Sequence, residues 1–206
     1  MVRLHPAFFR EAFPPRFINN IYLDSKRYDN FFDNIDGVSR RSKVRIRWYG
    51  DLSTSIDKPA LEFKIKDGLF GSKNHFCLVP FTFDNTFDIN RLRQIISNSQ
   101  LPPAEKIKLL NLIPTLVNRY RRKYYESIDK RFRITIDSQM SFRQIDQHGN
   151  LFLNNRMDEQ SIVLELKYDK IHEHDASTIS NFFPFRMTKS SKYVNGIKLL
   201  HGHLSV

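Results

Sequence analysis

The sequence is constrained most by the stretch from Arg41 to Trp48, in which basic and other side chains alternate at every position. Successive side chains of a β-strand point to opposite faces, so this pattern predicts a strand with one cationic and one largely apolar face. The cationic side chains are Arg41, Lys43, Arg45 and Arg47. Like charges about 7 Å apart on one face repel each other. A single strand of this kind is usually a solvated face of an antiparallel sheet, so the interpretation depends on whether other strands repeat the pattern.

Three further stretches, at residues 61–66, 131–137 and 162–168, repeat the alternation of charged and apolar side chains. Together with Lys73, the basic residues of the charged faces are Arg41, Lys43, Arg45, Arg47, Lys64, Lys66, Lys73, Arg131, Arg133 and Lys167. The acidic residues are Glu62, Asp137 and Glu165. If these strands form an antiparallel barrel with the charged face inward, its interior is a cationic channel suited to a polyanion and a metal ion. Ordinary solvated faces remain the alternative.

The composition supports an anionic partner. The 206 residues include 33 Lys and Arg against 22 Asp and Glu, a net charge of +11, which suits nucleic acid, a phosphate-rich molecule or a membrane surface. We expect a single domain over residues 1–206, since a chain of this length fits one all-β barrel. Cys77 alone allows no internal disulfide, which favours a reducing, cytoplasmic location. No apolar stretch is long enough for a membrane span, and no signal-peptide pattern follows Met1.

Helical patterns interrupt the strands, so the predicted class is α+β. The expected helical ranges are 4–13, 25–35, 88–96, 103–111, 173–181 and 190–201. The first is expected to end at Pro14-Pro15, because proline cannot continue a helix. Further strands are expected at 17–24, 113–126, 130–137, 139–145 and 160–170, with a turn at Gly149-Asn150. In the 113–126 strand, alternation does not decide which of Arg119, Arg121 and Arg122 faces inward.

Two carboxylates stand out as possible metal ligands. Glu62 and Glu165 each begin a Glu-x-Lys sequence on a charged face. Carboxylate oxygens among phosphate-binding cations suit Mn²⁺ or Mg²⁺, whose remaining ligands are waters and substrate phosphates. The alternative is that each glutamate forms an ion pair with a neighbouring lysine or arginine. No Walker-type or Rossmann glycine motif is present.

Seven sequence segments, in this order, resemble the VTC domain, the catalytic domain of vacuolar transporter chaperone polyphosphate polymerases and their bacterial relatives. They are Asn20 to Asp24, Arg41 to Gly50, Leu61 to Lys66, Tyr120 to Tyr125, Phe132 to Asp137, Val163 to Tyr168 and Ser191 to Val194. The resemblance covers about residues 18–196. It implies a triphosphate tunnel metalloenzyme fold, related to CYTH domains: an antiparallel tunnel of up to eight strands that holds a triphosphate or a growing polyphosphate, with a C-terminal closing helix.

The resemblance also implies roles for individual residues. The predicted phosphate-holding and catalytic residues are Arg45, Arg47, Lys64, Lys73, Arg122 and Arg133. Lys189 and Lys192 are expected on the closing helix, and Lys43, Lys66 and Lys167 on the charged faces as further substrate contacts. Glu165, together with Glu62 from the argument above, is the expected metal site. The first strand usual in the family, of the type [RK]-[YF]-E-[RK]-K-[FY], is not found at the N-terminus, which reads Met-Val-Arg-Leu-His-Pro.

The expected function is therefore transfer of the γ-phosphoryl of a nucleoside triphosphate to phosphate or polyphosphate. A tripolyphosphatase of the same fold, or a non-catalytic module that binds polyphosphate or inositol phosphates, would need the same cationic residues. Nucleic-acid binding is not expected, because Trp48 and Tyr49 lie only at the end of the cationic face and no base-stacking aromatics are interleaved with it.

Overall fold

The computed structural model describes residues 1–68, 70–145 and 154–204. They form two compact units. The first unit comprises Met1–Phe17, Tyr120–Met140 and Asp158–Ser190, and the second comprises Ile18–Arg119, Ser141–Met157 and Ser191–Val206. A single functional domain over residues 1–206 stays a prediction.

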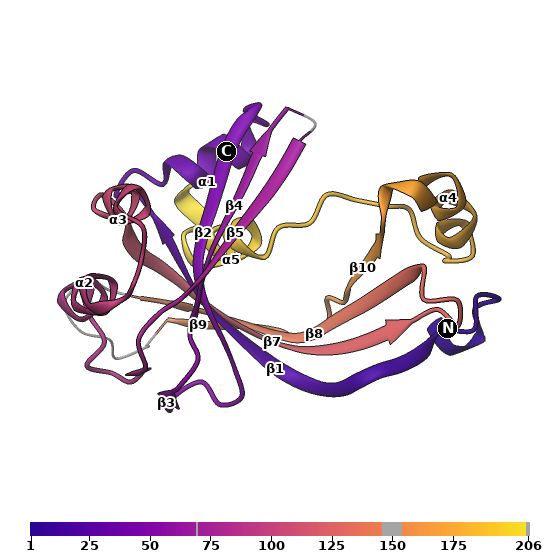
Figure 1. Ribbon diagram of the computed structural model, residues 1–206, viewed down its shortest axis with the longest axis horizontal. Helices are drawn as coiled ribbons and strands as arrows, with labels where there is room; N and C mark the ends of the chain where they lie inside the picture. The colour runs from indigo at the N-terminus through magenta and orange to yellow at the C-terminus, as the bar shows by residue number, and fades with distance from the viewer. Residues whose placement is uncertain (69, 146–153, 205–206) are drawn as a thin grey trace. The chain divides into compact units, whose positions relative to one another are not determined.

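The described residues form an antiparallel sheet with helices, which confirms the α+β class (Figure 1). The strands are β1 Arg10–Asp24, β2 Arg40–Tyr49, β3 Ser55–Ile56, β4 Ala60–Asp67, β5 Phe70–Cys77, β6 Phe81–Thr82, β7 Ile113–Glu126, β8 Phe132–Gln144, β9 Asn155–Asp158 and β10 Val163–Tyr168. The helices are α1 Asp29–Ile35, α2 Ile89–Asn98, α3 Pro103–Leu109, α4 Glu173–Asn181 and α5 Lys192–Leu200, with 3-10 turns at Val2–Leu4, Lys170–His172 and Gly202–Leu204.

The hydrogen-bonded order of the main sheet is β10-β8-β7-β1-β2-β4-β5, with β9 paired to β8 and a separate β3-β6 ladder. Wherever the register is determined, neighbouring strands are antiparallel. Closing a sheet into a barrel requires a continuous ladder of paired strands. Among the described residues the order ends at β10 and at β5, so the sheet is open.

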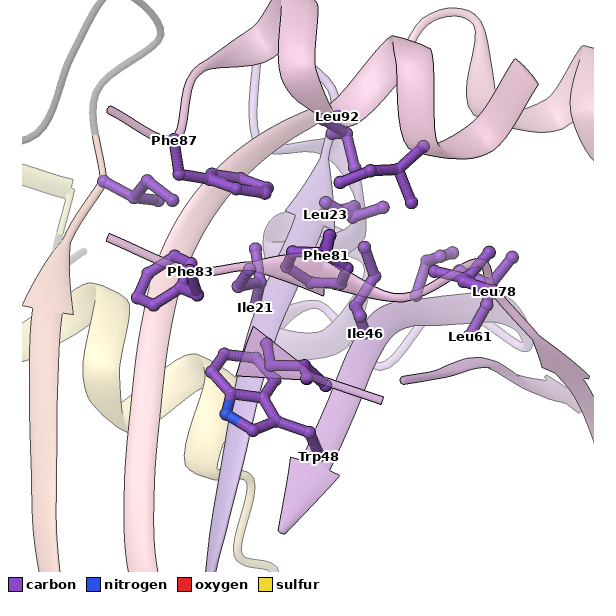
Figure 2. Packing of buried hydrophobic residues seen from close by; sticks show 14 of the residues in the cluster. Ile21, Leu23, Ile46, Trp48, Leu61, Leu78, Phe81, Phe83, Phe87 and Leu92 are labelled. Carbon is purple, nitrogen blue, oxygen red and sulfur yellow. The ribbon is translucent and has the colours of Figure 1, made fainter. Parts of the chain in front are cut away.

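The second unit is built on the apolar face of β1, β2 and β4. Val44 of β2 lies opposite Phe63 of β4, and Ile46 opposite Leu61, so alternate residues of both strands share a buried face. Figure 2 shows this face packed against Phe81, Phe83 and Phe87, which follow β5, and against Leu92 of α2. Because alternate side chains of these strands are buried in this core, the side chains between them point to the opposite face of the sheet.

Helix α2 forms close to its predicted range for the expected reason. Asp88 adopts an extended conformation, and its side chain accepts a hydrogen bond from the backbone N–H of Arg91 at 2.7 Å. Ile89, Leu92 and Ile95 are buried along one face of the helix. Pro103 likewise begins α3, where its missing N–H costs nothing.

The predicted N-terminal helix over 4–13 is wrong. β1 begins at Arg10 and continues through Pro14-Pro15 as extended backbone. Leu4 is 86% exposed and Phe13 59% exposed, so the apolar stripe that suggested a helix does not form. Proline is compatible with this strand because its fixed φ suits extended backbone, and only the ladder hydrogen bonds of its own N–H are lost.

The first unit has a small core of its own. In β8 and β10, Ile134 lies opposite Leu166 and Ile136 opposite Leu164, and these apolar side chains pack with Phe9. α4 contributes Ala176 to the same core and occupies the predicted range. This packing leaves the alternate residues of β8 and β10 on the opposite, charged face.

Near β8, the prediction of two separate strands is wrong, and the predicted turn lies outside the described residues. The two strands expected at 130–137 and 139–145 are one strand, and Gln139 takes a positive φ of 52° within it. The turn expected at Gly149-Asn150 lies outside the described residues. None of the helices formed by the described residues is long and apolar enough to cross a membrane.

Candidate functional site

The cationic face predicted from alternation forms in the second unit. Arg45 lies opposite Glu62, Lys43 opposite Lys64, and Lys64 in turn opposite Lys73. Directly opposite residues of antiparallel strands lie on the same face. The basic residues on this face of β2, β4 and β5 are Arg41, Lys43, Arg45, Arg47, Lys64, Lys66 and Lys73. We call this surface the cationic face.

Glu62 lies at the centre of three of these cations. Its carboxylate is 2.6 Å from Nη2 of Arg45, 2.7 Å from Nζ of Lys73 and 3.3 Å from Nη1 of Arg47. Glu62 is 4% exposed, whereas Lys73 is 51% exposed. Burial alone would raise the pKa of Glu62, but the charges of Arg45 and Arg47 and the hydrogen bonds from Lys73 and Arg45 lower it to about 2. Glu62 therefore stays ionised and holds the three cations together.

This geometry favours the ion-pair interpretation of Glu62 over the metal-ligand one. One of its oxygens accepts a hydrogen bond from Arg45, and the other contacts the charged groups of Lys73 and Arg47. A metal at Glu62 would have to displace at least one of these cations. The assignment of Glu62 to a metal site stays a prediction that the arrangement does not favour.

Arg47 is oriented by a second strand as well. Its Nε donates a hydrogen bond to Oδ1 of Asn20, at 3.2 Å, and Asn20 lies opposite Arg47 in the β1-β2 ladder. The side chains of Asn20 and Arg47 are both buried. Asn20 was not identified from the sequence, because an asparagine within an apolar strand gives no signal of the residue it will contact.

Lys43 connects the cationic face to the start of α5. Its Nζ donates a hydrogen bond to Oγ of Ser191, at 2.9 Å, and Ser191 caps α5 by accepting from the backbone N–H of Val194. Burial, together with the nearby charges of Lys64, Arg41 and Arg45, lowers the pKa of Lys43 to about 8. The charge of Lys43 therefore changes within an accessible pH range.

The helix that carries Lys192 is shorter than predicted. α5 begins at Lys192 because Ser191 is its N-cap in extended conformation, so the expected start at residue 190 and the placement of Lys189 on this helix are wrong. Lys189 is exposed and precedes the helix, in the first unit. The predicted i, i+3 relation between the two lysines is therefore not formed.

A buried hydrogen-bond network fixes α5 against α1 and β1. The hydroxyl of Tyr193 donates to Oδ2 of Asp24, and the Tyr193 ring stacks on that of Tyr22 at 5.0 Å. Asp24 also accepts backbone N–H groups of Asn30 and Phe31 at the start of α1. Figure 1 shows α1 and α5 beside each other. Burial raises the pKa of Asp24 and, together with the Asp24 charge, that of Tyr193.

The first unit has a separate polar cluster on the charged face of β7, β8 and β10. Arg122 binds Asp137 with two parallel hydrogen bonds, from Nε to Oδ1 and from Nη2 to Oδ2, the latter 2.7 Å long. Glu165 lies at its edge, 3.9 Å from Nη2 of Arg122 and 3.7 Å from Nζ of Lys167. Lys167 lies opposite Arg133, which is exposed. Arg122 is thus the arginine of its strand that joins these predicted residues.

Arg119 has a different environment. It belongs to the second unit, where its Nη1 donates a hydrogen bond to Asn19 at 3.3 Å, and Asn19 lies opposite Trp48 in the ladder. It therefore lies on the apolar side of β1 and β2. Sequence alternation could not decide which of these arginines faces inward, because the strand carries basic residues on both of its faces.

The carboxylates offer limited support for a metal site. Among the described residues, no group of three or more His, Cys, Asp or Glu side chains could hold a metal ion by itself. Glu165 is half-exposed, and its ion-pair distances of 3.7 and 3.9 Å are long. This donor set fits an ion that takes most of its ligands from phosphates and water, as Mg²⁺ does.

Comparisons with known proteins place this arrangement in context. A family model described as the VTC domain matches residues 15–201. One solved structure, of a candidate adenylyl cyclase from Hippeastrum described as showing a dominant triphosphatase activity, has a TM-score of 0.49 and 13% identity, and the match covers 89% of this chain and 82% of that chain. At that identity and score the likeness is distant. No curated protein sequence matches the chain.

Proposed function

The chain belongs to the VTC domain family, and on this premise we propose that it is a polyphosphate polymerase domain. It would transfer the γ-phosphoryl of a nucleoside triphosphate to phosphate or to the end of a polyphosphate chain. The observation that carries the proposal is the cationic face, where seven lysines and arginines of β2, β4 and β5 share a face with one glutamate of those strands. Such an excess of fixed positive charge needs an anionic ligand with several charges in a row.

The chemistry asks little of the protein beyond positioning and charge neutralisation. Phosphoryl transfer passes through a state with charge spread over the phosphoryl oxygens, and charged hydrogen-bond donors held in place lower its energy. Arg45, Arg47 and Lys73 are already oriented by Glu62 before any ligand arrives. We expect them, with Lys64, to hold phosphoryl oxygens, and Lys43 and Lys66 to extend the binding surface along the strands.

The remaining predicted residues have supporting roles in this proposal. Phosphate contacts are also expected for Arg133 and Lys167 of the first unit, for Lys189, which precedes α5, and for Lys192, the first residue of α5. Arg122 would act mainly through Asp137 and Glu165, since its guanidinium is already paired. We expect Mn²⁺ or Mg²⁺ at Glu165, where such an ion would supply charge neutralisation on phosphoryl oxygens.

The direct test incubates the pure chain with ATP and Mn²⁺ and follows both nucleoside diphosphate and chain length on a polyacrylamide gel. A polymerase yields ADP together with chains that lengthen with time. Release of orthophosphate without chains would replace the proposal with a triphosphatase. Tight triphosphate binding without turnover would replace it with a binding module.

A further inference from the structure

Glu62 occupies the position that an anionic ligand of the cationic face would be expected to take. Its two carboxylate oxygens receive Arg45, Arg47 and Lys73 at distances between 2.6 and 3.3 Å. We call these three cations the Glu62 trio. A carboxylate satisfies them in the same way as two oxygens of a phosphoryl group would, because both present two charged acceptor oxygens on one central atom. The protein therefore carries its own anion at this point.

Two cations of the Glu62 trio also contact side chains of β1. Arg47 also binds Asn20, and Arg45 lies 3.4 Å from the hydroxyl of Tyr22 through Nη1. The three cations are consequently held in place in the absence of a ligand. A small anion that arrives here meets donors that are already engaged and a negative charge in contact with them, which costs binding energy.

The neighbouring lysines, unlike the trio, lie opposite basic residues or glycine rather than beside a carboxylate. Lys64 lies between Lys43 and Lys73 in the ladder, and Lys66 lies opposite Gly71. The acid on this part of β2, β4 and β5 is Glu62, so neighbouring lysines repel one another; the pKa of Lys43 is lowered first by burial and then by the nearby charges, that of Lys64 among them. A ligand that spans several strand positions can contact these lysines and, at the same time, the side of the trio that faces away from Glu62.

We propose that Glu62 is a specificity-determining residue: it excludes single phosphates from Arg45, Arg47 and Lys73, while linked phosphates still bind by contacting the neighbouring lysines at the same time. This inference rests on the proposed function, because it assumes that the cationic face binds phosphate chains. It gives Glu62 a role different from metal coordination. It also means that orthophosphate, including any that serves as the acceptor, would have to bind outside these three cations.

The test is calorimetric titration of the full chain with orthophosphate and, separately, with triphosphate, in metal-free buffer. For the wild type we expect triphosphate to bind and orthophosphate to bind far more weakly. Glu62→Gln keeps the shape of the side chain and removes its charge, so orthophosphate affinity should rise by at least about tenfold because the anion no longer meets a negative charge beside the three cations. The ratio of triphosphate to orthophosphate affinity should fall.

The matched control is Asp67→Asn, which removes the same charge from an exposed residue at the end of the same strand, on the side opposite to the cationic face. Its affinity ratio should equal that of the wild type. Should Glu62→Gln fail to fold, Glu62→Asp keeps the charge but shortens the side chain, and its orthophosphate affinity should rise by a smaller factor. An unchanged ratio in a folded Glu62 variant, or a wild type that binds orthophosphate as tightly as triphosphate, overturns the inference. Absence of triphosphate binding in the wild type and in Asp67→Asn would instead count against the proposed function, and with it this inference.

Discussion

Both units place a carboxylate among basic side chains, but the net charge of the two clusters differs. In the second unit one carboxylate, Glu62, holds three cations, and the lysines beside them add further positive charge. In the first unit two basic residues, Arg122 and Lys167, lie beside two carboxylates, Asp137 and Glu165. The cations of the second unit exceed its carboxylate, so positive charge remains for a ligand. The charges in the cluster of the first unit nearly cancel. We therefore expect the second unit to dominate anion binding and the Arg122–Asp137 pair to contribute mainly to stability.

The largest expected effect tests the structural half of this comparison. Asp137 is 1% exposed and forms two hydrogen bonds with Arg122. Asp137→Ala leaves a buried arginine without its main partner, so the free energy of unfolding should fall by about 3–5 kcal/mol. Urea denaturation measures the loss. A loss below about 1 kcal/mol would show that the pair is not a stabilising element of the first unit.

The next effect concerns ligand binding at the second unit. Arg45→Ala removes a charged donor from the cationic face, and triphosphate affinity should fall by about 1.5–3 kcal/mol, the contribution of a charge-assisted hydrogen bond. Calorimetry measures it. The control is Arg40→Ala, which removes an exposed arginine from the other face of the same strand. Equal losses in the two variants would mean that net charge rather than the cationic face binds the ligand.

Glu165 separates a metal-binding role from an ion-pair role. Glu165 is 46% exposed, so Glu165→Gln should leave stability nearly unchanged. If Glu165 binds the metal, the variant should lose Mn²⁺-dependent turnover while retaining triphosphate affinity in metal-free buffer. Adding Mn²⁺ with triphosphate should raise the melting temperature of the wild type further than triphosphate alone, and that extra rise should be absent in the variant. An equal extra rise in both proteins would place the metal elsewhere.

The smallest expected effect is a pH dependence set by Lys43. Its pKa is lowered from 10.5 to about 8, so between pH 8 and 10.5 the unfolded chain binds more protons than the folded one. Stability should therefore rise slightly with pH in that window on account of this group. A bound polyanion favours the charged amine, so triphosphate binding near pH 8.5 should take up protons. Calorimetry in buffers of different ionisation enthalpy measures the uptake, which should disappear in Lys43→Met.

The sequence was informative where structure depends on local pattern. Alternation correctly predicted which side chains of β2, β4, β8 and β10 share a face, because the period of a strand is fixed by its backbone. It failed for residues 4–13, where aromatic spacing resembled a helix but the side chains of Leu4 and Phe13 remain exposed. Helical spacing of apolar residues predicts a helix only if that face becomes buried.

The contacts between distant residues could not be predicted from the sequence. Arg122 and Asp137 are 15 positions apart, and Tyr193 and Asp24 are 169 positions apart. Alternation placed Glu62 on the charged face but could not show that its carboxylate binds three cations at once. The family resemblance, confirmed by the match over residues 15–201, implied the kind of ligand but not this arrangement.

The central claim is that a phosphate chain binds to the cationic face of the second unit, and a crystal structure of the chain with triphosphate and Mn²⁺ tests it most directly. We predict phosphoryl oxygens within hydrogen-bond distance of Arg45, Lys64 and Lys73, with the Glu62 carboxylate still bound to its arginines. Triphosphate bound only at Arg133 and Lys167 of the first unit, with the cationic face empty, would contradict the account.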